Sequence, residues 1–186
     1  MMHLRSVLPL AVVVMLVLGL TTSCALFETS TNDTNLAVQA TNIAVIERNY
    51  DEVWNQGDLA VIDEIYSGNY VGHDSHSAAD RRGLDGVRQH VTMYRTAFPN
   101  VLFSVEDIFA AEDRVAVRWT ASGKHMGPMM EMEPTEKEAT IMGISIFRLV
   151  NGKIEETWFG WDTMDMMQQL GAVVQMGNGP SGSIDR

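Results

Sequence analysis

Cysteine, basic charge and long apolar runs are scarce in this sequence, and each scarcity excludes a class of protein. The single cysteine, Cys24, excludes a disulfide within the chain. Only 13 lysines and arginines stand against 24 acidic residues, a net charge of −11, so no basic stripe is available to hold a nucleic acid backbone. No glycine-rich phosphate loop, nucleophile elbow or Cys/His dyad is present, and no bound cofactor is expected. The 186 residues contain no internal repeat and suit one domain with a real core.

The N-terminal residues 1–24 are predicted to be an export segment. Arg5 supplies a positive charge, and the uncharged run Val7–Leu20 is shorter than the roughly twenty residues of a membrane span. Small residues precede Cys24, an arrangement that resembles the site where bacterial lipoproteins are cleaved and lipidated. We therefore expect a protein of the bacterial cell envelope, anchored to the membrane by a lipid on Cys24. The alternatives are a plain secretory signal, which yields a secreted or periplasmic protein, and an uncleaved anchor.

Two segments of low hydrophobicity flank the predicted domain. Residues 25–35 are rich in serine, threonine and asparagine and are expected to form a flexible tether. Residues 176–186 are rich in glycine and serine and are expected to form a disordered tail. The folded domain is therefore expected to span residues 36–175.

The first half of this domain is predicted to be largely helical. Ile43, Ile46 and Tyr50 recur at helical spacing, and comparable patterns follow further along the chain. A short strand and a polar loop are expected between the second helix and the third. The predicted helices are Leu36–Asn55, Leu59–Tyr66 and Leu84–Ala97, the strand is Asn69–His73, and the loop is Ser75–Arg82.

From Val101 onward the apolar residues alternate with polar ones, which is the period of a β-strand. Asn151 and Gly152 separate two apolar runs and predict a tight hairpin turn before a last strand, Lys153–Asp162. Four long strands joined by short turns imply antiparallel pairing. The predicted fold class is α+β: a curved, mainly antiparallel sheet wraps around three N-terminal helices and encloses a cavity, open at one end, that suits a small molecule.

The last strand carries large aromatic side chains on both of its faces. Alternation puts Thr157, Phe159 and Trp161 on one face and Glu156, Trp158 and Gly160 on the other. Two interpretations remain open: a core strand covered on both sides, or a strand with one face in a pocket. Beyond the strand, Met164, Met167 and Leu170 recur at helical spacing, and Gly171 can end that helix.

Several segments in sequence order carry a resemblance to a known family. They are Asn49–Asp74, Gly86–Ile108, Arg114–Gly127, Glu133–Thr135, Gly143–Ile154 and Asn151–Ala172. Together they resemble the SnoaL-like polyketide cyclases, often labelled ester cyclases, within the cone-shaped superfamily typified by nuclear transport factor 2. The resemblance implies a cone-shaped α+β barrel and a small apolar or polyketide-like ligand in its cavity. It also implies a homodimer formed through the outer sheet face, where Trp158 would suit an interface.

In that family an aspartate on the final strand acts as general acid/base for an intramolecular aldol closure, because an apolar cavity raises the pKa of a carboxyl. The matching position here is Phe159, which cannot move a proton. Asp162 is the nearest carboxylate, either a helix N-cap or a displaced acid/base. His125 matches a family histidine and either relays a proton or is a hydrogen-bonded histidine at a strand end. His73, expected near the cavity mouth, is the third catalytic candidate.

A metal site at His73, Asp74 and His76 is not expected, because these three side chains lack a further ligand at a defined spacing. The cavity itself is expected to be lined mainly by aromatic side chains, together with a methionine that fills irregular apolar space. The predicted ligand-binding residues are Phe159, Trp161, Thr157, Ser145, Tyr94, Trp54 and Met129.

Two functions fit these observations. The first is an envelope-tethered domain that binds a small apolar or polyketide-like molecule, with cyclisation, isomerisation or hydrolysis by acid/base chemistry as its activity if it is an enzyme. The second is a non-catalytic, dimeric module for ligand binding or protein interaction. The substitution of the family's aspartate by Phe159 leaves the enzymatic activity open.

Overall fold

A computed structural model describes residues 33–74, 79–129 and 132–172. The chain divides into two compact units, Met1–Val38 and Gln39–Arg186, and the fold below is that of the second. The predicted export segment with Cys24 and the predicted tail lie outside the described residues, as do His76 and most of the tether. Within the described part of the chain, no helix has the length and apolar character needed to cross a bilayer.

The predicted helices are present, with altered ends. Within this unit a helix over 39–48 continues as the wider π-helix η1 (Asn49–Gln56), and Gly57 ends it with a φ of 75°. Helix α3 (Gly83–Ala97) agrees closely with the prediction. Helix α2 (Val61–Ile65) is shorter than predicted, because Tyr66 already pairs with Ile154 as the first residue of a strand.

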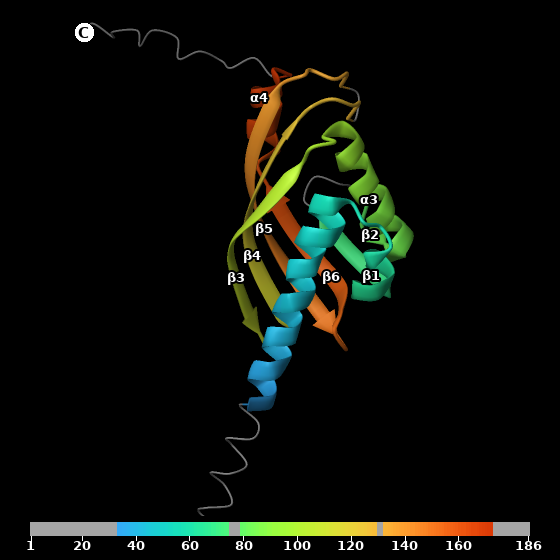
Figure 1. The fold of residues 1–186 in the computed structure, drawn as a ribbon, viewed down its shortest axis with the longest axis vertical. Coiled ribbons are helices and arrows are strands. Elements are labelled where there is room, and N and C mark those ends of the chain that lie inside the picture. The colour runs from blue at the N-terminus through green and yellow to red at the C-terminus, as the bar shows by residue number, and fades with distance from the viewer. Residues whose placement is uncertain (1–32, 75–78, 130–131, 173–186) are drawn as a thin grey trace, which may run out of the picture. The chain divides into compact units, whose positions relative to one another are not determined.

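Six strands form one sheet in the order β2-β1-β6-β5-β4-β3. The sheet curves around η1 and α3, which both lie on its concave side (Figure 1). All neighbours pair antiparallel except β1 and β6, which run parallel. The strands are β1 (Tyr66–Asp74), β2 (Arg81–Arg82), β3 (Leu102–Ala111), β4 (Arg114–Lys124), β5 (Glu138–Val150) and β6 (Lys153–Trp161).

Two strands differ from the prediction at the edge of the sheet. Strand β1 extends beyond Asn69–His73 at both ends, since its pairing with β6 continues from Tyr66 to Asp74. The segment Ser75–Arg82, predicted to be a loop, ends in the two-residue strand β2. This short strand pairs only with β1 and brings Arg81 to the side of the sheet that faces α3.

The last helix, α4 (Thr163–Leu170), begins and ends where the sequence predicts. The carboxylate of Asp162 accepts a hydrogen bond from the backbone N–H of Asp165 at 2.9 Å, which is an N-cap. Gly171 ends the helix in the left-handed conformation, with a φ of 79°.

The interior contains two clusters of buried apolar side chains. The larger one lies between η1, α3 and the concave face of the sheet, around residues such as Ile46, Tyr50 and Val117. The smaller one lies where α4 packs against β5, around Met129 and Met166. Burial of this apolar surface is the main term that stabilises the unit.

Trp119 fixes the packing between β4 and β5. Its indole N–H donates to Ser145 Oγ at 2.9 Å, and its ring lies directly over Gly143. A Cβ atom at Gly143 would overlap that ring, so the strand requires glycine at this position.

Candidate functional site

An inner cavity of about 110 Å³ lies between the concave face of the sheet, η1 and α3. Its wall contains the three residues predicted to share one face of β6, which confirms the alternation along that strand. Of the two interpretations of β6, the pocket-lining face is the one that the structure shows. Six of the seven predicted ligand-binding residues lie in the wall: Trp54, Tyr94, Ser145, Thr157, Phe159 and Trp161.

Aromatic rings form about half of the cavity wall and hold one another in place. The ring centroids of Trp54 and Phe103 lie 5.0 Å apart, and Tyr94 meets Trp54 edge-on at 6.3 Å and Trp161 at 6.4 Å. Such tilted and edge-to-face pairs are favourable and restrict the rotamers of their members. The cavity is therefore a preformed apolar space with flat walls, which suits an aromatic or unsaturated ligand.

His90 of α3 is a polar group of this wall that was not among the predicted site residues. It lies between the rings of Trp54, Tyr94 and Phe159, at centroid distances of 5.5, 5.0 and 5.6 Å. Burial, together with the smaller effect of the positive charge on Arg81, lowers the pKa of His90 from 6.5 to about 3. The imidazole is therefore neutral at physiological pH, with one nitrogen a donor and the other an acceptor.

Tyr94, beside His90, also keeps one protonation state. Burial raises the pKa of Tyr94 to about 12, and the negative charge of Asp74 acts in the same direction. The phenol therefore stays protonated near neutral pH and can donate a hydrogen bond to a ligand.

Arg81 brings a positive charge to this apolar wall. Its Nη1 lies 3.2 Å from the carboxylate of Asp74, and its guanidinium lies 4.4 Å from the ring centroid of Phe159. Phe159, where the family resemblance leads us to expect an aspartate, thus contacts a cation with its π face. Arg81 was not among the predicted site residues because it was expected in a polar loop, and the pairing of β2 with β1 brings it to the cavity.

None of the three predicted catalytic residues lines the inner cavity, and neither does Met129. Asp162 caps α4, as its alternative interpretation proposed. His125 is fully buried, accepts a hydrogen bond from the Thr135 backbone N–H at 3.2 Å and packs on Phe98. Met129 fills the smaller core cluster instead of the cavity wall, because it packs beside Met166 and Leu170.

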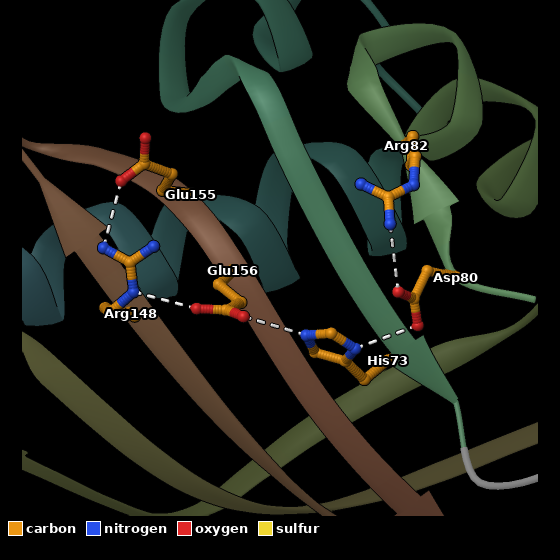
Figure 2. A network of polar contacts seen from close by, with 6 residues as sticks. All are labelled: His73, Asp80, Arg82, Arg148, Glu155 and Glu156. Atoms are coloured by element: carbon orange, nitrogen blue, oxygen red, sulfur yellow. Dashed lines mark hydrogen bonds and ion pairs between the residues drawn. The ribbon is translucent and has the colours of Figure 1, made fainter.

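His73 lies on the outer face of the sheet, in a polar network that Figure 2 shows. Its Nδ1 lies 2.9 Å from Asp80 and its Nε2 lies 2.9 Å from Glu156. The hydrogen bond to Glu156 raises the pKa of His73, and the contact with Asp80 adds to this. Arg148 continues the network through Glu156 at 2.9 Å and Glu155 at 3.0 Å.

This network joins the sheet edge to its centre. It links the segment before β2 with β1, β6 and β5, and the ring of His73 stacks on Trp158 at 5.2 Å. These hydrogen bonds and ion pairs hold neighbouring strands in place on the outer face of the sheet, and they do not reach the inner cavity. Among the described residues, no group of three histidine, cysteine or acidic side chains is arranged to hold a metal ion.

A curved sheet that closes a cavity over helices defines the cone-shaped α+β class typified by nuclear transport factor 2. The model of the SnoaL-like polyketide cyclase family matches residues 44–170, and the chain belongs to this family. A comparison with curated proteins gives no significant match.

Solved structures agree with this fold. A protein of Jannaschia sp. CCS1, assigned as a SnoaL-like polyketide cyclase, is 21% identical with a TM-score of 0.68, over 73% of this chain and 95% of that one. IdmH of Streptomyces antibioticus, assigned as a polyketide cyclase, is 28% identical with a TM-score of 0.61, over 70% and 98%. AclR of Streptomyces galilaeus, assigned as a hydroxylase, is 26% identical with a TM-score of 0.66, over 75% and 87%. Two assigned activities on one fold mean that the site must decide the function.

Proposed function

We propose that the folded unit binds one small, flat apolar molecule in the inner cavity and acts as a binding protein rather than as an acid/base enzyme. The observation that best supports this proposal is the fixed protonation state of the titratable side chains named below, which line the cavity. The pKa of His90 is about 3 and that of Tyr94 about 12, and burial raises the pKa values of Tyr50, Tyr66 and Tyr70. An efficient general acid or base has a pKa near the working pH, and none of these five groups does.

The size of the cavity limits the ligand. A cavity of roughly 150 Å³ binds benzene, whereas drug-sized ligands occupy pockets of roughly 300–1,000 Å³. The 110 Å³ found here is smaller than that benzene site, so one ring is the upper limit, and a ring with a short substituent already needs a small adjustment of the wall. A polycyclic polyketide needs movement of the aromatic wall before it can enter.

Binding is tested with acetophenone, a single-ring probe, by isothermal titration with the purified chain. Ala121 is buried in the cavity wall, so Ala121→Leu fills part of the space and is expected to weaken binding at least about tenfold. Ala116→Leu, on the same strand but facing away from the cavity, is the matched control and keeps the affinity. Equal affinities in the two variants would show that the probe binds elsewhere. Turnover of a cavity ligand, with loss of that turnover in Ala121→Leu, would overturn the binding-protein assignment.

The proposal includes a location in the bacterial cell envelope, with a lipid on Cys24. Its support is the sequence of residues 1–24 alone. Metabolic labelling of the full chain with a palmitate analogue tests it in a bacterial host. We expect label in the wild-type chain and none in Cys24→Ser, and an unlabelled wild-type chain would contradict it.

A second candidate, a homodimer formed through the outer sheet face, rests on the apolar side chains there. Met142 and Ile144 are each 57% exposed and Ile146 is 37% exposed, in one row along β5 beside Trp158. An exposed contiguous apolar patch is a common mark of an interface. Sedimentation is expected to show a dimer that Ile144→Lys dissociates and that Thr140→Lys, at the end of the row, does not. A monomeric wild-type chain at about 100 μM would contradict the dimer.

A further inference from the structure

One end of the inner cavity is polar, and three neighbouring strands build it at the same level. Gly72 of β1 pairs with Arg81 of β2 on one side and with Thr157 of β6 on the other. Arg81 and Thr157 both line the cavity. Because residues paired across a sheet point to the same face, the row Arg81–Gly72–Thr157 puts a guanidinium and a hydroxyl on either side of a glycine.

The hydroxyl of Tyr70 occupies the space over that glycine. Tyr70 also lines the cavity, two residues before Gly72 on the same strand, and a Cβ atom at Gly72 would lie 2.5 Å from its Oη. Burial raises the pKa of Tyr70, and both the Thr157 hydroxyl and the Arg81 guanidinium oppose this rise, which places both groups near the phenol oxygen. Three polar groups therefore meet at this end of a cavity whose wall is largely apolar.

Two atoms of this cluster are buried without a hydrogen-bond partner among the described residues. They are Nη2 of Arg81 and Oγ1 of Thr157. Buried polar atoms are almost always paired, and an unmade hydrogen bond to a charged group is especially costly. Two such atoms in one cluster of the cavity wall indicate that an oxygen atom from outside the chain completes their hydrogen bonds.

The charges of the cluster decide which oxygen it accepts. Arg81 is already paired with Asp74 at 3.2 Å, and their side chains are only 17% and 10% exposed, so the pair is nearly neutral and shielded from water. A carboxylate ligand would add an uncompensated negative charge beside Asp74, which is unfavourable in a buried site. A neutral carbonyl or enol oxygen adds no charge and can accept the free guanidinium N–H.

We propose that Arg81, Tyr70 and Thr157 form a binding site for the carbonyl oxygen of a neutral, single-ring ketone or related carbonyl compound, with the ring of the ligand held between the aromatic walls. This assignment rests on the proposed function of the cavity and names its ligand class. It makes Gly72 a specificity-determining position, because a Cβ atom there would lie 2.5 Å from the Tyr70 hydroxyl and displace it.

Two probes of nearly equal shape test the assignment by isothermal titration. Acetophenone carries a carbonyl oxygen where α-methylstyrene carries a CH₂ group. The measured quantity is the ratio of their dissociation constants, α-methylstyrene over acetophenone, because differences in their hydration cancel when variants are compared. Loss of one hydrogen bond from a neutral hydroxyl, which is what each variant below removes, is expected to lower this ratio about two- to tenfold.

The variants are chosen to change this oxygen site and little else. Gly72→Ala displaces the Tyr70 hydroxyl, and Thr157→Val removes one hydroxyl at constant shape, so both are expected to lower the ratio. Gly68→Ala is the matched control on the same strand, because a Cβ atom there meets no atom within 4 Å. In the wild-type chain, the guanidinium nitrogen resonances of Arg81 are expected to shift with acetophenone and not with α-methylstyrene, a readout that needs no variant.

Each outcome separates this assignment from the function on which it rests. If the wild-type chain binds both probes and neither variant changes the ratio, the oxygen site is refuted while the cavity remains a binding site. If benzoate, the carboxylate of similar size, binds more tightly than acetophenone, the neutral ligand class is refuted. If the wild-type chain binds neither probe at the limit of its solubility, both proposals fail.

Discussion

Acidification is predicted to destabilise the folded unit through His90. The pKa of His90 in the fold is about 3, against 6.5 for an unperturbed histidine, so between these values only the unfolded chain takes up the proton. Stability therefore falls as the pH drops below about 6.5. At about pH 5 the gap of roughly 1.5 pH units corresponds to about 2 kcal/mol of lost stability, at about 1.4 kcal/mol per unit.

The assay is urea unfolding followed by tryptophan fluorescence at about pH 7, 6 and 5, with the wild-type chain and His90→Gln compared. The variant retains a polar side chain but does not titrate, so the difference between the two pH dependences isolates His90 from all other groups. We expect the wild-type chain to lose about 2 kcal/mol more than the variant, a difference of about 4–8 °C in Tm. Parallel pH profiles would mean that the imidazole is protonated inside the fold. Water would then reach His90 among the rings that surround it, and the cavity wall would not keep the fixed protonation states on which the proposed function rests.

Three further variants test the packing, the helix cap and the outer network. Gly143→Ala is expected to cost about 1–3 kcal/mol in urea unfolding, because its methyl overlaps the ring of Trp119, whereas Gly160→Ala, with open space at its Cβ, stays within about 0.5 kcal/mol. Asp162→Ala is expected to cost about 1 kcal/mol through loss of the N-cap and to leave probe affinity unchanged; a tenfold weaker affinity would restore Asp162 as a cavity residue. The raised pKa of His73 gives a contribution that is complete below about pH 6.5 and is lost as the pH rises through that pKa. Because the side chain is 32% exposed, His73→Gln should remove no more than about 1 kcal/mol of pH dependence between about pH 6 and 9, and an unchanged profile would contradict the charged contact.

The parts of the site that follow from local pattern could be predicted from the sequence. Alternation along the last strand placed Phe159 and Trp161 on one face, and that face lines the cavity. Asp162 lies at a strand end immediately before residues with helical spacing, and in the structure it is the N-cap of α4. Both features depend on neighbours within a few residues, which is the range over which the period of a strand or the start of a helix is encoded.

The polar end of the cavity depends on contacts that no local pattern reveals. Tyr70 and Arg81 reach Thr157 only because β1 runs parallel to β6, and the expectation of antiparallel pairing gave no reason to place them together. His125 and Met129 were predicted to lie near the ligand, because no local pattern reveals the contact that keeps them away from the cavity. The chain after β4 returns to the end of α3, where the Met126 N–H donates to the Ala97 carbonyl at 2.8 Å, and this contact directs both side chains into a separate core.

The parallel pairing of β1 with β6 also determines when the cavity can exist during synthesis. Gly72 meets Thr157 only after nearly the whole domain has been made, and the pairing closes a long loop whose entropy must be lost first. A nascent chain that ends before Lys153 contains η1, α2, α3 and the β3–β4 hairpin, but it lacks α4 and β6, and with β6 the cavity-lining residues Thr157, Phe159 and Trp161. Ligand binding is thus among the last properties that the growing polypeptide acquires, and a ligand that stabilises the finished unit cannot assist the early steps of its folding.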